Sequence, residues 1–149
     1  MSLFNTISED IKKAMLAKEK EKLESLRAVK AAFLLARTNV GASGELSPEE
    51  ELKIVQKLVK QRRESAEIYQ QQNRQDLADK ELLEASFIEK YLPAQMSEQE
   101  LEVILKAIIE RVDAKTPADM GKVMGVATKE LSGKADGKAI STKVKQLLS

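Results

Sequence analysis

The sequence predicts an all-α protein, with an N-terminal four-helix unit followed by a small three-helix C-terminal unit. Alanine, leucine, lysine and glutamate dominate the chain, and these residues lose little on entering a helix. Aromatic residues make up 3% of the sequence and proline occurs three times, so residues that favour sheets or interrupt helices are few. Apolar residues recur at spacings of three and four, and no stretch alternates as a strand does.

Four helices are expected in residues 1–93, each with one apolar face. A bend near Lys18 separates the first from the second, and Gly41 is placed to end the second. The four apolar stripes are Phe4, Ile7, Ile11 and Ala14; Leu26, Val29, Phe33, Ala36 and Val40; Leu52, Val55, Val59, Ala66 and Tyr69; and Leu82, Leu83, Ala85, Phe87, Ile88 and Leu92.

The third of these helices carries the clearest start signal. Ser47, with Pro48 at the first helical position and Glu50 three residues later, predicts a capping box. Arg62 occupies a position of the apolar stripe. Either its stem packs while its head reaches a carboxylate or water, or it is a buried arginine that fixes helix pairing.

The fourth helix follows a turn in "QQNRQD". Asn73 tolerates a left-handed backbone, and Asp76 is placed to cap the helix. Pro93 ends it, because the residue before a proline avoids helical geometry. We therefore place the boundary between the two units after Pro93.

The C-terminal unit, residues 94–149, is expected to hold three short helices. About 50 residues is small for an independent core, so we expect this unit to lean on the first unit or on a partner. The expected N-caps are Ser97, with Glu100 three residues on, Thr116, with Pro117 next, and Asp136. The apolar stripes are Leu101, Ile104, Leu105, Ile108 and Val112; Met120, Val123, Met124, Ala127 and Leu131; and Ile140, Val144, Leu147 and Leu148.

Composition excludes several classes of function. The chain contains no cysteine and no histidine, so disulfides, thiolate metal sites and triads that depend on either residue are impossible. No G-x-x-x-x-G-K-[ST] phosphate loop occurs. A serine–lysine nucleophile pair remains an alternative that would need a pocket. We therefore expect no metal, no cofactor and no catalysis by this chain alone.

The sequence also bears on location. The N-terminal residues lack a basic segment followed by an apolar run, so they do not resemble a secretory signal. The longest apolar run, residues 31–36, is far too short to span a bilayer. We expect a soluble cytoplasmic protein with no membrane partner.

Residues 120–149 form the one locally basic block. They hold six lysines against two acidic residues, whereas residues 95–119 hold three basic and six acidic residues. The candidate nucleic-acid contacts are Lys122, Lys129, Lys134, Lys138, Lys143 and Lys145, interleaved with Gly121, Gly125, Gly133 and Gly137.

Two interpretations of this block remain open. Glycines beside lysines suit phosphate contact, because the backbone can come close to an anion. Alternatively, Gly121 and Gly125 allow two helices to approach, Gly133 ends a helix, and the lysines form a solvated face. No aromatic residue is interleaved to stack bases, so neither base-specific contact nor DNA specificity is expected.

The sequence resembles the YqeY family along nearly its whole length. The resemblance rests on "SLRAVKAAF", "KQRRES", "NRQDLADKE", "EKYLP" and "MGKVMG…GKADGK…VKQLL", which occur in the family's order. The C-terminal set is the most specific, because both its spacing and the positions of its glycines match the family's pattern. The family typically has glycine where this chain has Asn73, and asparagine can serve the same turn.

The resemblance implies a two-part helical fold whose C-terminal part is similar to the tail domain of the tRNA-dependent amidotransferase B subunit. That enzyme converts misacylated Glu-tRNA or Asp-tRNA to the glutaminyl or asparaginyl form, and its tail helps to hold the tRNA. Its catalytic core has no counterpart here. A family label of carbon–nitrogen ligase with glutamine as amido donor therefore implies association with the reaction rather than catalysis of it.

The sequence thus favours a non-catalytic module that contacts tRNA or another structured RNA. The alternative is a protein-interaction adaptor that docks on an amidotransferase or an aminoacyl-tRNA synthetase. An enzyme in its own right is the third hypothesis, and the missing histidine, cysteine and nucleotide loop argue against it.

Overall fold

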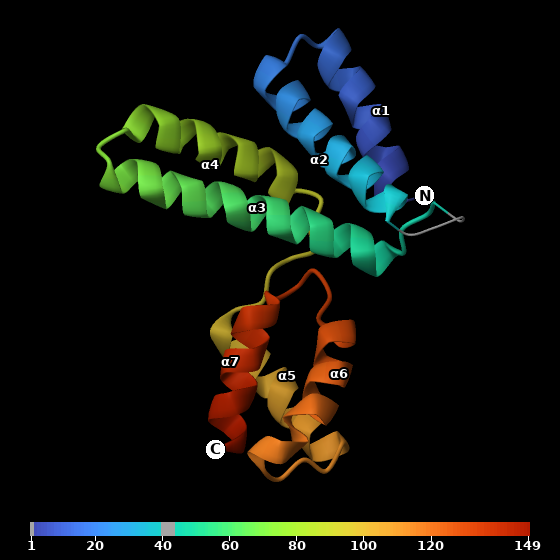
Figure 1. Cartoon of the computed structure of the whole chain (residues 1–149), viewed down its shortest axis with the longest axis vertical. Helices are drawn as coiled ribbons and strands as arrows, with labels where there is room; N and C mark the ends of the chain where they lie inside the picture. The colour runs from blue at the N-terminus through green and yellow to red at the C-terminus, as the bar shows by residue number, and fades with distance from the viewer. Residues whose placement is uncertain (1, 40–43) are drawn as a thin grey trace. The chain divides into compact units, whose positions relative to one another are not determined.

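The computed structural model describes residues 2–39 and 44–149. Within these ranges the chain is helical and contains no strand, which confirms the all-α class (Figure 1). The elements are α1 (Leu3–Leu16), α2 (Lys20–Thr38), α3 (Pro48–Gln71), α4 (Gln75–Glu89), α5 (Glu98–Arg111), the 3₁₀ turn η1 (Pro117–Asp119), α6 (Met120–Glu130) and α7 (Gly137–Leu148).

The chain divides into two compact units, Met1–Leu92 and Pro93–Ser149. The N-terminal unit contains α1 to α4, and the C-terminal unit contains α5, η1, α6 and α7. The stop at the end of the second helix was expected at Gly41, which lies outside the described residues, as does Val40.

The N-terminal unit consists of two helical hairpins, α1 with α2 and α3 with α4 (Figure 1). The first turns at Lys18 and the second at Asn73, which have φ values of 58° and 60°. This left-handed geometry suits asparagine and confirms the turn expected there. The buried core draws on the predicted stripes: Ile7, Ile11, Leu26, Val29, Phe33, Val55, Val59, Ala85 and Ile88.

Polar contacts across helices hold the hairpins together. Arg62 Nε lies 3.3 Å from Glu84 Oε2, and both side chains are less than a fifth exposed. The Arg62 head therefore reaches a carboxylate, as the first interpretation expects. Because Glu84 lies on α4, the same contact also joins α3 to α4, as the second expects. Glu51, only 3% exposed, accepts a 2.9 Å hydrogen bond from the Phe4 backbone N–H, which satisfies a free donor at the start of α1.

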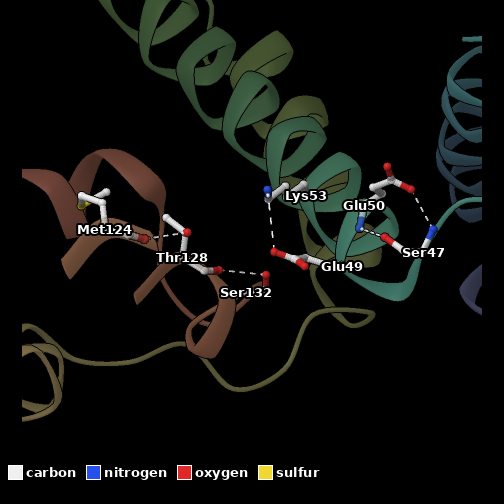
Figure 2. A network of polar contacts seen from close by, with 7 residues as sticks. All are labelled: Ser47, Glu49, Glu50, Lys53, Met124, Thr128 and Ser132. Atoms are coloured by element: carbon white, nitrogen blue, oxygen red, sulfur yellow. Dashed lines mark hydrogen bonds and ion pairs between the residues drawn. The ribbon is translucent and has the colours of Figure 1, made fainter. Parts of the chain in front are cut away.

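Helix starts agree with the sequence in part. The Ser47 hydroxyl accepts from the Glu50 N–H at 3.2 Å, and the Glu50 carboxylate accepts from the Ser47 N–H at 2.8 Å, so the predicted capping box is present (Figure 2). The cap predicted at Asp76 is wrong. Helix α4 begins one residue earlier, at Gln75, and Asp76 instead receives two bonds from the Arg74 guanidinium.

The C-terminal unit packs α5, α6 and α7 around its own core. Its buried residues come from the predicted stripes and from one loop alanine: Leu101, Leu105, Ile108, Ala114, Val123, Ala127, Leu131, Ile140, Val144 and Leu148. Ser97 caps α5 by accepting from the Glu100 N–H at 3.1 Å. Gly133, with a φ of 74°, makes the turn after α6 that a left-handed residue allows.

Two further starts agree with expectation in part. Thr116 is an N-cap with Pro117 at the first position, as predicted, but the element that they begin is the 3₁₀ turn η1, and α6 follows from Met120. Asp136 occupies the N-cap position of α7 by its backbone, but its side chain makes no capping hydrogen bond to that helix.

Candidate nucleic-acid interface

The six candidate lysines are divided between two helices and the loop that joins them. Lys122 and Lys129 lie on α6, Lys134 lies in the loop, and the others lie on α7. Lys138 and Lys145 are seven residues apart, hence on one face of α7. Lys143 lies nearly opposite Lys145 around the helix axis, because two residues of helix turn a side chain through about 200°.

The structure brings three of these lysines together at a groove of about 510 Å³ in the C-terminal unit. Two backbone-directed bonds build it: Met96 N–H donates to Lys134 O at 3.1 Å, and Gln95 Nε2 donates to Gly133 O at 2.7 Å. These bonds tie the segment before α5 to the loop before α7. The groove is lined by Gln95, Met96, Glu98, Leu101, Lys134, Ala135, Asp136, Lys138, Ala139, Thr142, Lys143 and Gln146.

Lys143 differs from the other lysines of the groove in its surroundings. Its side chain is 14% exposed, and its ammonium lies 3.3 Å from Glu98 Oε1. The Glu98 side chain is 77% exposed, and Lys134 and Lys138 are exposed as well. The groove therefore includes a largely covered ammonium that is paired with an exposed carboxylate.

The lysines of α6 lie outside the lining of this groove. Lys122 and Lys129 are both exposed and share a helix face. Lys122 Nζ lies 3.9 Å from the Asp119 carboxylate. Bonds from the Lys115 and Thr116 backbone N–H groups lower the pKa of the Asp119 carboxyl below its usual value, so this carboxylate remains charged beside Lys122.

The glycines of α6 do not serve close helix contact. A Cβ added at Gly121 or Gly125 would meet no heavy atom within 4 Å in the described structure, which contradicts the helix-approach interpretation. Both positions are exposed. The neighbouring hydroxyls are occupied: Thr128 donates to Met124 O at 2.7 Å and Ser132 donates to Thr128 O at 3.1 Å (Figure 2).

Charge in the folded unit is more balanced than charge along the sequence. The block 120–149 carries six lysines against two carboxylates, giving +4, while residues 95–119 carry three basic and six acidic groups, giving −3. Helix α5 belongs to the second segment and packs against α6 and α7. Its Glu98 is the functional neighbour that sequence reasoning missed.

A signal for the groove was present in the sequence. Lys138, Ala139, Thr142, Lys143 and Gln146 recur at spacings of three and four beside the buried stripe of α7. This pattern marks one continuous face. The residues opposite it, near the start of α5, depend on tertiary packing and carried no such signal.

The described parts of the chain show neither a membrane-spanning helix nor a metal centre. No helix there is long and apolar enough to cross a bilayer. No group of three or more acidic residues there is arranged to hold a metal ion.

Comparison with known proteins decides the family. A family model described as "Yqey-like protein" matches residues 4–148. The chain belongs to the YqeY family.

Several fungal proteins are related to this YqeY chain, and each is named "Altered inheritance of mitochondria protein 41, mitochondrial". The relative from Clavispora lusitaniae is 36% identical over 91 residues, which is 61% of this chain and 52% of that protein. One from Saccharomyces cerevisiae (strain YJM789) is 31% identical over 140 residues, 91% of this chain and 71% of that protein. The chain spans about half the length of the Clavispora lusitaniae and Meyerozyma guilliermondii relatives.

These relatives also correct one expectation. A cytoplasmic location was inferred from the lack of a secretory signal and of a long apolar run, and that inference is wrong, because the YqeY relatives are named as mitochondrial proteins. The physical reason is simple. A composition suited to water does not distinguish one aqueous compartment from another.

Proposed function

We propose that the C-terminal unit contacts the phosphate backbone of tRNA or another structured RNA, and that the chain acts as a non-catalytic accessory module. The observation that carries this proposal is the gathering of Lys134, Lys138 and Lys143 at one groove. The resemblance of this part to the tail domain of the amidotransferase B subunit supports the same class of ligand. An amidotransferase is accordingly the enzyme with which we associate the chain.

The lysines contribute as point charges. Each contact between a lysine and a phosphate releases counterions, so the logarithm of the binding constant falls by about 0.7–0.9 for each tenfold rise in salt and each contact made. Lys134, Lys138 and Lys145 are exposed on the loop and on α7 and make the first set of contacts. Lys122 and Lys129 form a second set on α6.

The test is RNA binding by fluorescence anisotropy with the full chain, at about 50 and about 200 mM salt. Because the relatives are named mitochondrial proteins, a mitochondrial tRNA is the first probe. The groove variant carries Lys134→Glu and Lys138→Glu. The matched control carries Lys106→Glu and Lys115→Glu, two exposed lysines of the same unit outside the groove.

We expect the groove variant to lose about tenfold or more in affinity and the control to lose much less, because long-range charge alone is screened within about 10 Å at this salt. Equal losses of affinity in the groove variant and the control would show that the groove is not the binding site. Absence of binding by the unmodified protein at the lower salt would contradict the function. Partners recovered from extract that survive nuclease would instead support the protein-adaptor alternative.

A further inference from the structure

We propose that the groove of the C-terminal unit accepts a single unpaired nucleotide, with the base against its apolar floor and the flanking phosphates at Lys134 and Lys138. This inference rests on the proposed contact with RNA. It goes further by naming the structural element of the RNA that is recognised and the place where its base lies.

The size and lining of the groove fit a nucleotide. A volume of about 510 Å³ lies within the range typical of small-ligand sites, which are mostly apolar with a few placed polar groups. Met96, Leu101 and Ala139 supply apolar surface along it. The flat face of a base loses unfavourable contact with water when it lies on such surface.

Polar groups surround that apolar surface. Thr142 and Gln146, one turn apart on α7, line the groove and offer hydrogen-bond donors and acceptors to a base edge or a ribose hydroxyl. The lining contains no aromatic ring. Base contact is therefore by dispersion and hydrogen bonding rather than by ring stacking, and selectivity among the four bases is low.

The burial of Lys143 favours an unpaired nucleotide over a duplex. A duplex is a convex rod whose phosphates reach cations that stand out from a surface, as Lys134 and Lys138 do. The Lys143 side chain is 14% exposed, and its ammonium lies 3.3 Å from Glu98 Oε1. A nucleotide free of pairing can enter the groove and approach this largely covered side chain more closely than a rigid duplex can.

The experiment compares two RNAs with the full chain: a blunt duplex, and the same duplex with a two-nucleotide 3′ overhang. The groove-filling variant is Ala139→Leu, which adds a side chain to an exposed groove position of α7. The control is Ala107→Leu, at an exposed position of α5 outside the groove. Leucine favours the helix at both positions, and circular dichroism establishes that each variant is folded.

We expect the unmodified protein to prefer the overhang RNA by about fivefold, a typical value for one net hydrogen bond. Ala139→Leu should remove most of that preference, because it weakens binding of the overhang RNA more than binding of the blunt duplex, and Ala107→Leu should change neither. No preference in the unmodified protein, or equal weakening of both RNAs by Ala139→Leu, would overturn nucleotide insertion but leave backbone contact standing. Failure of the unmodified protein to bind either RNA would overturn the proposed function itself.

A second measurement does not depend on variants. Titration of the ¹⁵N-labelled chain with uridine 5′-monophosphate should shift the backbone amides of Thr142 and Gln146 as well as those beside Lys134 and Lys138, whereas inorganic phosphate should shift only the amides beside the two lysines. Identical shift patterns for the two probes would mean that the groove holds phosphate alone, and nucleotide insertion would then be wrong.

Discussion

Lys143 shows how a single residue acquires its properties from folding. The sequence identified it as one of six similar lysines, but only in the folded chain does it lie beside Glu98, 45 residues earlier. Its charge is then partly neutralised and its side chain largely covered. Pairing over such a distance depends on how α5 packs against α7, which local spacing does not encode.

Replacement of the partner carboxylate should raise RNA affinity. In Glu98→Gln, the part of the RNA that enters the groove no longer competes with a carboxylate for the Lys143 ammonium. A pair with one exposed partner contributes about 0.5–1 kcal/mol, so affinity should rise about two- to fivefold. Anisotropy with the overhang RNA at low salt measures it. The control is Glu102→Gln, whose carboxylate pairs with Lys106 on the same helix. An equal gain in the control would show a general effect of charge.

Tyr91 should make stability depend on alkaline pH. Its hydroxyl donates to Asp10 Oδ2 at 2.5 Å, and burial together with that carboxylate raises the pKa of the phenol. A tyrosine in the unfolded chain has a pKa of about 10. Because folding raises the pKa of Tyr91, its contribution to stability is complete below that pH and is lost as the pH rises above it. Tyr91→Phe should therefore lower the free energy of unfolding by about 1 kcal/mol at pH 7. Between pH 9 and 11 the variant should lose less stability than the unmodified protein loses.

Urea unfolding at pH 7, 9 and 11 measures that difference. The control is Tyr69→Phe, since Tyr69 is half-buried but has no hydroxyl hydrogen bond recorded in the described structure. General alkaline effects, such as lysine deprotonation, act on both variants equally. A cost for Tyr69→Phe as large as that for Tyr91→Phe would remove the role assigned to the Asp10 contact.

At the scale of the element, helix existence and apolar faces could be predicted, and helix starts only in part. The start of α3 could be predicted because the side chains of Ser47 and Glu50 each accept a hydrogen bond from the other residue's backbone N–H, and these two residues are close in sequence. The start of α4 was not, because Arg74 occupies the N-cap position, and Asp76, the second residue of the helix, pairs with the Arg74 guanidinium. Cap chemistry is predictable when no neighbouring cation competes for the carboxylate.

Helix α6 should be stabilised by alanine at its glycines. Glycine in a helix interior costs about 0.5–1 kcal/mol relative to alanine. Gly125 lies in the middle of α6 and Gly121 in its first turn, and a Cβ at either position would meet no heavy atom of the described residues within 4 Å. Gly125→Ala should raise the free energy of unfolding by about that amount in chemical denaturation, and Gly121→Ala should raise it by less. Gly133→Ala should lower it, because Gly133 is buried with a φ of 74°. Destabilisation by all three would show that α6 is packed more closely than described.

At the scale of the whole molecule, the sequence predicted where apolar side chains go but not how polar groups from separate helices meet. Both buried clusters consist mostly of residues from the predicted stripes, because a stripe defines the buried face of its own helix. The groove required three segments to come together at Met96, Lys134 and Lys138. The glycine hypothesis failed for a related reason, since the space beside a helix depends on what packs there.

The two clusters lead to a prediction about cooperativity. Each unit has its own buried cluster. Removal of the two methyl groups of a buried valine should therefore destabilise only the unit that contains it. Val123→Ala, at a fully buried position of α6, should cost about 2 kcal/mol and speed amide hydrogen exchange in α5 to α7. The matched variant Val55→Ala, also fully buried, should do so in α1 to α4. If Val123→Ala loosens all seven helices equally, the two units unfold as one cooperative unit and the prediction is wrong.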